Sequence, residues 1–339
     1  MALKAGIVGY GFAGRIFHAP ALVSAGFEVT AICARALDKK AAAHQDFPKA
    51  IIVTSIDEIL DEDLDLIVIA TTNDVHVEHA KAAISSGVAT VVDKPVARTY
   101  LETLELFELA ERNHVPLAAF FNRLWDSDSL TVKKALSEDV IGTPFRLDAR
   151  FERFRPQLNP SAWRESTDPE LGGGILLDLQ THLVSTALDW FGPAELVHAS
   201  IRAVRGAADD DVVLTLRHQS GVDSYLSASA IVGSPGPRVR LLGDKGSLVI
   251  EDLDHQEGEL RKGFMPQEGS WLENSLITSE ARIHKGESSF NFPGIPGAYQ
   301  EFYRLFREAL EIGSPLPVSR DLALQVAAIL DQAREITVR

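Results

Sequence analysis

The sequence has little cysteine, no long apolar run and fewer cations than anions. Cys33 is the only cysteine in 339 residues, which excludes an internal disulfide framework and a cysteine-rich zinc site. No run of about 18 apolar residues is present, so no membrane-spanning helix is expected. The formal net charge of −15 disfavours a nucleic-acid partner, which would require a basic face. A predicted strand close to Met1 leaves no room for a signal peptide, so the expected compartment is the cytoplasm.

Strand-like and helix-like segments alternate over residues 1–122 and predict a first domain with a doubly wound parallel sheet. Short, almost continuous apolar runs are typical of strands that helices cover on both faces. The predicted strands are Ala5–Val8, Val29–Cys33, Ala50–Val53, Leu64–Ala70, Thr90–Val92 and Leu117–Phe121. The clearest predicted helices between them are Val75–Ser85 and Thr99–Arg112.

Residues 123–339 show a different pattern and predict a second domain. Alternating apolar and polar residues are typical of an antiparallel sheet with one covered face. The predicted strands are Phe145–Phe154, Leu196–Val204, Val212–His218, Tyr225–Val232 and Arg238–Ile250, and the predicted helices are Ser129–Ser137, Tyr299–Glu311 and Arg320–Ile336. The last helix is a candidate for packing back on the first domain. Asp254–Pro296 has little periodicity and is expected to be a lid or an interface loop.

The segment Gly9–Gly14 reads GYGFAG and has three glycines at G-x-G-x-x-G spacing, between a predicted strand and a predicted helix. Such a turn lets the backbone approach a pyrophosphate and lets the helix pack closely on the strand. The phosphates would then lie against the N-terminal amides of the helix. An ordinary glycine-rich turn is the alternative, but the flanking strand and helix favour a dinucleotide site. Its residues are Gly9, Gly11, Phe12, Ala13 and Gly14.

The end of the second predicted strand bears on the choice of cofactor. The carboxylate that binds the adenosine ribose of NAD usually follows the last glycine by about 20 residues. Here that position falls at Ala34, with Arg35 next. An arginine can form charge-assisted hydrogen bonds with a 2′-phosphate, each worth about 1.5–3 kcal/mol. The sequence therefore predicts NADP, and NAD is the alternative if Arg35 is only a solvated surface residue.

Two further segments carry side chains suited to chemistry on a substrate. Lys94 follows the fifth predicted strand, and ligands of open α/β sheets bind at the carboxyl ends of the strands. Three glycines at 172–174 precede a predicted helix on which Asp178 and His182 share a face. A lone lysine is more often a solvated charge, and polar stripes are common on surface helices. The residue pattern alone leaves both interpretations open.

In their order along the chain, these motifs resemble the Gfo/Idh/MocA oxidoreductase family, named for glucose-fructose oxidoreductase and inositol dehydrogenase. The resemblance covers nearly the whole length and is strongest to an NADP-dependent subgroup. The matching segments are the glycine turn, Phe17–Pro20, Ala70–Asn73 with His76, Asp93–Pro95, Phe121–Asp126, Trp163–Glu165 and the helix with Asp178 and His182. Asp93 stands where the family usually has glutamate, and Leu179–Thr181 replaces a small glycine-centred segment.

The resemblance implies an α/β fold with an N-terminal Rossmann domain and a C-terminal α/β domain that has an open, predominantly antiparallel sheet. It also implies a sugar, a polyol or a related small molecule as substrate, and a homodimer or homotetramer formed through the second sheet. The implied catalytic residues are Lys94, Asp178 and His182. The implied cofactor residues include Thr71, Asn73, His76, Asp93 and Lys94, and the candidate substrate residues are Arg123, Trp125, Trp163 and Arg164.

These residue types suit hydride transfer between a nicotinamide and a CH–OH carbon. Histidine, with an unperturbed pKa of about 6.5, can move the hydroxyl proton. Asp178 can orient the imidazole of His182, and Lys94 can bond the reacting oxygen. Lys94 could instead carry the proton if its pKa is lowered. No catalytic metal is required, and no cluster of histidine and carboxylate residues in the sequence suggests one.

Two other functions are compatible with the same fold. One is a non-catalytic NAD(P)-binding sensor, because a fold does not fix a function. The other is an enzyme that keeps its NADP bound and uses it in internal redox cycling. A sensor has no need for Lys94, Asp178 and His182 together, so the set favours an enzyme.

Overall fold

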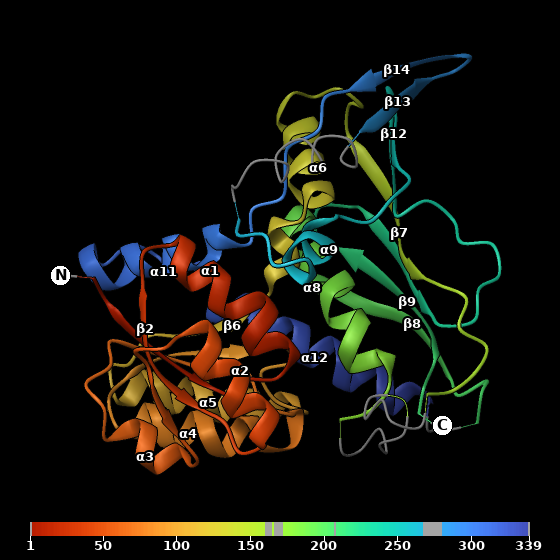
Figure 1. Cartoon of the computed structure of the whole chain (residues 1–339). Helices are drawn as coiled ribbons and strands as arrows, with labels where there is room; N and C mark the ends of the chain where they lie inside the picture. Colours follow the sequence, from red (N-terminus) through yellow and green to blue (C-terminus); the bar gives the residue numbers. More distant parts are fainter. Residues whose placement is uncertain (1, 160–164, 166–171, 207, 267–279, 338–339) are drawn as a thin grey trace. The chain divides into compact units, whose positions relative to one another are not determined.

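The computed structural model describes residues 2–159, 165, 172–206, 208–266 and 280–337 (Figure 1). The chain divides into two compact units. The first contains the described residues of 1–122, 256–271 and 298–323, and the second those of 123–255, 272–297 and 324–339. Both units are therefore discontinuous in sequence.

A six-stranded parallel sheet forms the centre of the first unit. Its strands lie in the order β3-β2-β1-β4-β5-β6, which is the strand order of a Rossmann domain. They are β1 (Lys4–Val8), β2 (Glu28–Cys33), β3 (Ile51–Val53), β4 (Leu66–Ile69), β5 (Ala89–Asp93) and β6 (Leu117–Phe120). Every residue of β4 and of β5 is buried, as expected when helices cover both faces. The predicted doubly wound parallel sheet is confirmed.

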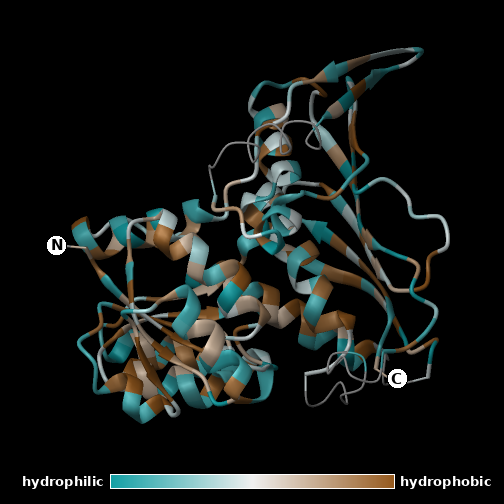
Figure 2. Cartoon of the chain, in the orientation of Figure 1, coloured by the Kyte–Doolittle hydropathy of each residue, from teal (hydrophilic) through white to brown (hydrophobic). Residues whose placement is uncertain are grey.

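Helices lie on both faces of this sheet (Figure 1). Each helix carries both hydrophobic and hydrophilic residues (Figure 2). They are α1 (Ala19–Ser24), α2 (Leu37–Asp46), α3 (Ile56–Leu60), α4 (His76–Ser85), α5 (Tyr100–Arg112) and α11 (Gln300–Ile312). The short helix α9 (Gln256–Arg261) also belongs to this unit and packs on the helical turn that follows β1. Side-chain capping explains where two of these helices, α3 and α5, begin. The side chain of Ser55 accepts from the amide of Glu58, and that of Thr99 accepts from the amide of Glu102, which stabilises each helix N-terminus.

A mixed sheet forms the centre of the second unit. Among the described residues it has eight strands in the order β14-β13-β12-β11-β7-β10-β9-β8. They are β7 (Pro144–Glu152), β8 (Ala194–Arg202), β9 (Asp211–His218), β10 (Asp223–Ser229), β11 (Val239–Gly243), β12 (Gly246–Ile250), β13 (Ala281–Lys285) and β14 (Ser288–Phe292). Only β7 and β10 pair in parallel. The predicted, predominantly antiparallel α/β domain is confirmed.

Two predictions for this region are wrong. Arg238–Ile250 is not one strand but the hairpin β11–β12. Its turn is fixed from outside, because Asp244 accepts from the amide of Thr143 (2.8 Å) and the amide of Lys245 donates to Ile141 (3.0 Å). Asp254–Pro296 is also not simply a loop, since its described part contains α9 and the hairpin β13–β14.

The remaining described helices are α6 (Ser127–Ser137), α8 (Thr181–Phe191) and α12 (Arg320–Thr337), with a π-helical turn η5 (Leu176–Gln180) before α8. Gln180 is buried and its amide nitrogen donates to the carbonyl oxygens of Val212 (2.9 Å) and Leu226 (3.0 Å). This side chain therefore ties η5 to β9 and β10. Among the described helices, none is both long and apolar enough to cross a membrane.

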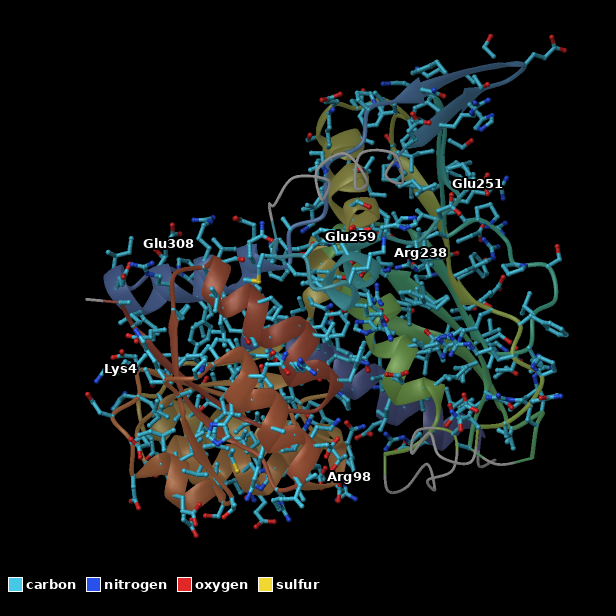
Figure 3. The ribbon with its side chains drawn as sticks, viewed as in Figure 1. Lys4, Arg98, Arg238, Glu251, Glu259 and Glu308 are labelled. Atoms are coloured by element: carbon cyan, nitrogen blue, oxygen red, sulfur yellow. The ribbon has the colours of Figure 1, made fainter. Side chains whose placement is uncertain are left out.

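A buried ion pair joins α6 to the sheet of the second unit. Nε of Arg238 lies 2.8 Å from Oδ2 of Asp128, and the two side chains are only 3% and 2% exposed. The guanidinium also lies 3.9 Å from the centre of the Phe151 ring. The backbone of Arg238 donates to the carbonyl of Glu251 (3.1 Å), and both residues are labelled in Figure 3. Arg238 thus connects α6, β7 and the end of β12.

Asp128→Asn is expected to lower the free energy of unfolding by about 3–5 kcal/mol, because it leaves the buried Arg238 charge uncompensated. Urea unfolding followed by circular dichroism measures the change. The matched control is Asp223→Asn, whose partner Arg217 is 58% exposed, and it should cost less than about 1 kcal/mol. Equal losses in the two variants would contradict the assigned importance of the buried pair.

Candidate functional site

The first unit has a pocket of about 480 Å³ where β1, β2, β3 and β4 end. Ligands of open α/β sheets bind outside these carboxyl ends. Five of the predicted cofactor residues line the pocket: Gly9, Gly11, Ala34, Arg35 and Thr71. The pocket therefore joins the glycine turn to the end of β2, as a site for the adenosine half of a dinucleotide requires.

The three glycines of the turn have different surroundings. Gly9 has φ +96°, and a Cβ there would lie 2.6 Å from the carbonyl oxygen of Ala70. A Cβ on Gly14 would overlap the carbonyl oxygen of Gly9, whereas a Cβ on Gly11 would meet no described protein atom within 4 Å. The protein itself therefore requires glycine at 9 and 14. The open space over Gly11 fits a group that approaches the backbone from outside.

The helix that follows starts as a π-helical turn, η1 (Ala13–His18). Its N-terminal end can face an anion. The amide of Arg15, the third residue, already donates to the carbonyl of Gly11 (3.0 Å). Phe12 is 44% exposed, and the guanidinium of Arg261 from α9 lies 4.2 Å from the centre of its ring. Phe12 and Ala13 thus belong to the turn, although neither lines the pocket.

Charged side chains surround the far end of the pocket. Arg35 follows β2 and Lys39 lies in α2. Asp57, Glu78 and His79 also line it, and sequence reasoning missed all three. The strand order could have indicated Asp57, because β3 lies beside β2 and its carboxyl end must open on the same space. Burial lowers the pKa of His79, so its imidazole is neutral at pH 7.

His76 holds together the segments that follow β4 and β5. Its ring is fully buried, with Nδ1 2.9 Å from the carbonyl oxygen of Pro95 and Nε2 3.0 Å from that of Thr71. Burial lowers the pKa of His76. A neutral imidazole has one N–H, so it donates to one carbonyl at a time. Asn73 is buried nearby in the short 3-10 helix η2 (Asn73–Val75). Neither Asn73 nor His76 lines the pocket, but His76 contacts the carbonyl of Thr71, which does.

Asp93 and Lys94 stand at the end of β5. Asp93 is buried; burial on its own would raise its pKa, but the neighbouring His18, Lys94 and His76 outweigh burial and lower the pKa. The Asp93 side chain is therefore a carboxylate at neutral pH. The Lys94–Pro95 peptide bond is cis. Lys94 is partly exposed and lies at the carboxyl end of the sheet, as predicted.

In the second unit, Asp209 fixes the start of the helix that carries the other candidate catalytic residues. Its carboxylate accepts from the amide of Leu176 (2.7 Å). Gly174 has φ +84°, and a Cβ there would overlap this carboxylate. Burial raises the pKa of Asp209, while the backbone amides of Leu176 and Ile175 oppose the rise. A side chain at position 174 would therefore collide with Asp209.

Asp178 lies in η5 and His182 in the first turn of α8. π-Helical turns inside helices are frequent at functional sites. His182 is buried, and its ring centre lies 6.1 Å from that of Phe151. Burial lowers the pKa of Arg153, and the charge of Asp178 is among those that oppose this. Asp178 therefore lies in the field of the partly buried Arg153 cation. Lys94 belongs to the other unit.

The structure describes two of the four candidate substrate residues, Arg123 and Trp125. Nη1 of Arg123 lies 3.0 Å from the buried carboxylate of Asp126, and its guanidinium lies 5.0 Å from the Phe151 ring. Trp125 ends the 3-10 helix η3 (Asn122–Trp125). Trp163 and Arg164 lie outside the described residues. Arg123 is thus held by a carboxylate and an aromatic ring near the strand that packs on His182.

Comparisons with known proteins agree with this architecture. Residues 3–121 match the family model of the oxidoreductase family with an NAD-binding Rossmann fold, and residues 129–249 match that of the GFO/IDH/MocA C-terminal domain. A scyllo-inositol 2-dehydrogenase (NADP(+)) of Bacillus subtilis, IolW, is 31% identical over 98% of this chain and 93% of its own. A D-apiose dehydrogenase of Paraburkholderia graminis is 31% identical over 79% of this chain and 74% of its own.

A solved structure of the protein yvaA from Bacillus subtilis superposes with a TM-score of 0.91 at 30% identity, covering 99% of this chain and 96% of that one. The two family models together match more than half of the chain. The strand order, the glycine turn and the second mixed sheet lead to the same assignment. The chain belongs to the Gfo/Idh/MocA family of oxidoreductases, whose N-terminal domain is an NAD-binding Rossmann fold.

Proposed function

We propose that this protein is a cytoplasmic, NADP-dependent oxidoreductase that transfers a hydride between the nicotinamide and a hydroxyl or carbonyl carbon of a sugar, a polyol or a related molecule. The names of its relatives support the substrate class: a scyllo-inositol 2-dehydrogenase, a D-apiose dehydrogenase and a 1,5-anhydro-D-fructose reductase. The first of them is named for NADP.

The preference for NADP depends on the pocket at the end of β2. Arg35 and Lys39 line it, whereas Ala34 stands where a ribose-binding carboxylate would follow the strand. Two exposed cations can bind a 2′-phosphate without losing a buried partner. Asp57 and Glu78 in the same pocket are possible acceptors for ribose hydroxyls and are the observation that favours NAD as the second candidate.

Arg35→Asp is expected to weaken NADPH binding about ten- to hundredfold, since it removes charge-assisted hydrogen bonds and adds a repelling carboxylate. NADH binding should change little or improve. Fluorescence titration of the reduced cofactors measures both dissociation constants. Lys40→Asp makes the same charge change in α2 outside the pocket and serves as the control. Equal weakening of NADPH and NADH by Arg35→Asp would contradict the NADP assignment.

The proposed chemistry assigns one task to each candidate residue. Oxidation of an alcohol removes the hydroxyl proton while a hydride leaves the same carbon, and the bound nicotinamide supplies the hydride chemistry. His182 would accept the proton at a ring nitrogen, with Asp178 orienting the imidazole. Lys94 would donate a hydrogen bond to the reacting oxygen and stabilise its developing negative charge. In the opposite direction His182 would return the proton.

Lys94→Ala and His182→Ala are each expected to lower kcat by at least about a hundredfold, because each removes a group that acts on the reacting oxygen or its proton. Binding of NADPH should stay nearly unchanged. Stopped-flow absorbance and fluorescence titration give the two quantities. Lys49→Ala and His44→Ala, both at exposed positions of the first unit, are the matched controls. Unchanged kcat in both active-site variants would remove the catalytic assignment.

The ratio of NADPH consumed to product formed distinguishes this proposal from the two alternatives. A dehydrogenase or reductase consumes or produces one NADPH for each turnover. Internal redox cycling converts substrate while the amount of NADPH stays constant, and a sensor binds NADPH without converting any substrate. Parallel measurement of product by chromatography and of NADPH by absorbance distinguishes the three outcomes.

We also infer a homodimer or homotetramer formed through the second sheet. One face of this sheet carries Asp148, whose side chain is only 2% exposed. Its carboxylate oxygens lie 2.9 Å from Nη2 of Arg146 and 3.2 Å from Nη1 of Arg240. The guanidinium of Arg146 lies 4.7 Å from the ring centre of Tyr225, which is 39% exposed. Arginine and tyrosine are enriched at protein interfaces, which supports this face as the contact surface.

Tyr225→Glu is expected to shift the assembly towards the monomer, because it replaces an exposed aromatic side chain of the proposed interface with a charge. Sedimentation velocity measures the mass in solution. Glu138→Gln, at the exposed C-terminal end of α6 and away from the sheet, is the control and should leave the mass unchanged. A wild-type protein that sediments as a monomer at high micromolar concentration would contradict the inference.

A further inference from the structure

Three buried polar side chains of the first unit form a row. Asp93 ends β5, His18 ends η1 and Tyr303 belongs to α11, and all three are buried. The hydroxyl of Tyr303 lies 2.6 Å from Nδ1 of His18, and Nε2 of His18 lies 3.6 Å from Oδ1 of Asp93. One imidazole therefore connects the helix after the glycine turn, the residue before Lys94 and a helix from the C-terminal part of the chain.

The surroundings of His18 determine where its proton lies. Burial and the charge of Asp93 raise the pKa of Tyr303 well above its ordinary value, so its hydroxyl keeps its proton. The hydroxyl can donate to a neutral Nδ1 or accept from a protonated one. A lone pair on Nε2 would face the Asp93 carboxylate and be repelled. In either protonation state, Nε2 therefore carries a hydrogen that points towards Asp93.

The distance between Nε2 of His18 and Oδ1 of Asp93 is longer than that of a hydrogen bond. At 3.6 Å, Nε2 has no hydrogen-bond partner among the described residues, although it is fully buried. At this distance the contact is a charge interaction rather than a close hydrogen bond, so the position of the imidazole decides how well Asp93 is held.

The residues on both sides of Lys94 are held by buried histidines. His18 faces the Asp93 side chain, and His76 lies 2.9 Å from the carbonyl oxygen of Pro95. We propose that His18 is a positioning residue for Lys94: with its ring oriented by Tyr303, it holds Asp93 and thereby the backbone that presents the Lys94 ammonium. The inference rests on the proposed role of Lys94 in the reaction.

A purely structural role for His18 makes a different prediction. Its ring also packs on Phe120, with the ring centres 4.1 Å apart. If packing were its only task, any smaller polar replacement would have similar consequences. The positioning role depends instead on which ring nitrogen is retained.

Two amide replacements separate these roles. The amide nitrogen of glutamine can take the place of Nε2, whereas that of asparagine reaches only the position of Nδ1. His18→Gln should keep kcat within about threefold of wild type, and His18→Asn should lower it by about tenfold or more, as expected for a misplaced catalytic group. The assay is oxidation of scyllo-inositol with NADP⁺. The dissociation constant of NADPH should change less than about twofold in both.

A second measurement does not depend on turnover. Nitrogen-15 NMR of the histidine rings reports which nitrogen of His18 is protonated, and the loss of its signals in His18→Gln assigns them. Wild type should show a proton on Nε2, and Tyr303→Phe should weaken this preference.

The outcomes separate the inference from the function it rests on. An Nδ1–H tautomer in wild type, or equal loss of kcat in His18→Gln and His18→Asn, would overturn the positioning role. A wild-type enzyme that shows the Nε2–H tautomer but converts neither scyllo-inositol nor any member of a panel of sugars and polyols would contradict the proposed function, while the orientation of His18 towards Asp93 would be supported.

Discussion

The close approach of two backbone segments at the glycine turn is the constraint on which the first unit depends. The end of β1 lies against the end of β4, and the first turn of η1 lies against Gly9, so Gly9 and Gly14 have no room for a side chain. This packing brings the N-terminal amides of η1 to the carboxyl edge of the sheet, beside the pocket that Arg35 lines. It also fixes the far end of η1, where His18 faces Asp93.

The proposed catalytic residues belong to different units, but the segments that carry them have one feature in common. Buried polar side chains contact the backbone or the neighbouring residue of each segment. Asp93, before Lys94, is kept ionised by His18, Lys94 and His76. The helix of Asp178 and His182 starts where Asp209 accepts the amide of Leu176. Such supporting groups keep catalytic side chains in place, and they explain why the proposed functions are best tested through variants that keep the packing.

Sequence patterns predicted the sheets well because buried strands consist mainly of apolar residues, which can be recognised in the sequence. The parallel strands of the first unit are continuous apolar runs, and the glycine turn follows the first of them. The hairpin within Arg238–Ile250 was missed because its turn is held by Thr143 and Ile141, contacts distant in sequence. Asp57 and Glu78 were missed for the same reason, since only strand order brings them to the pocket.

We propose that the chain exchanges hydride between NADP and a polyol or sugar. Absorbance at the reduced-nicotinamide band, recorded with a panel of cyclic polyols, sugars and their keto forms and with both cofactors, tests it most directly. We expect a change in absorbance that requires both substrate and cofactor, is faster with the NADP pair, and is lost in Lys94→Ala. Substrate conversion without any net change in nicotinamide, or no conversion with any member of the panel, would contradict it.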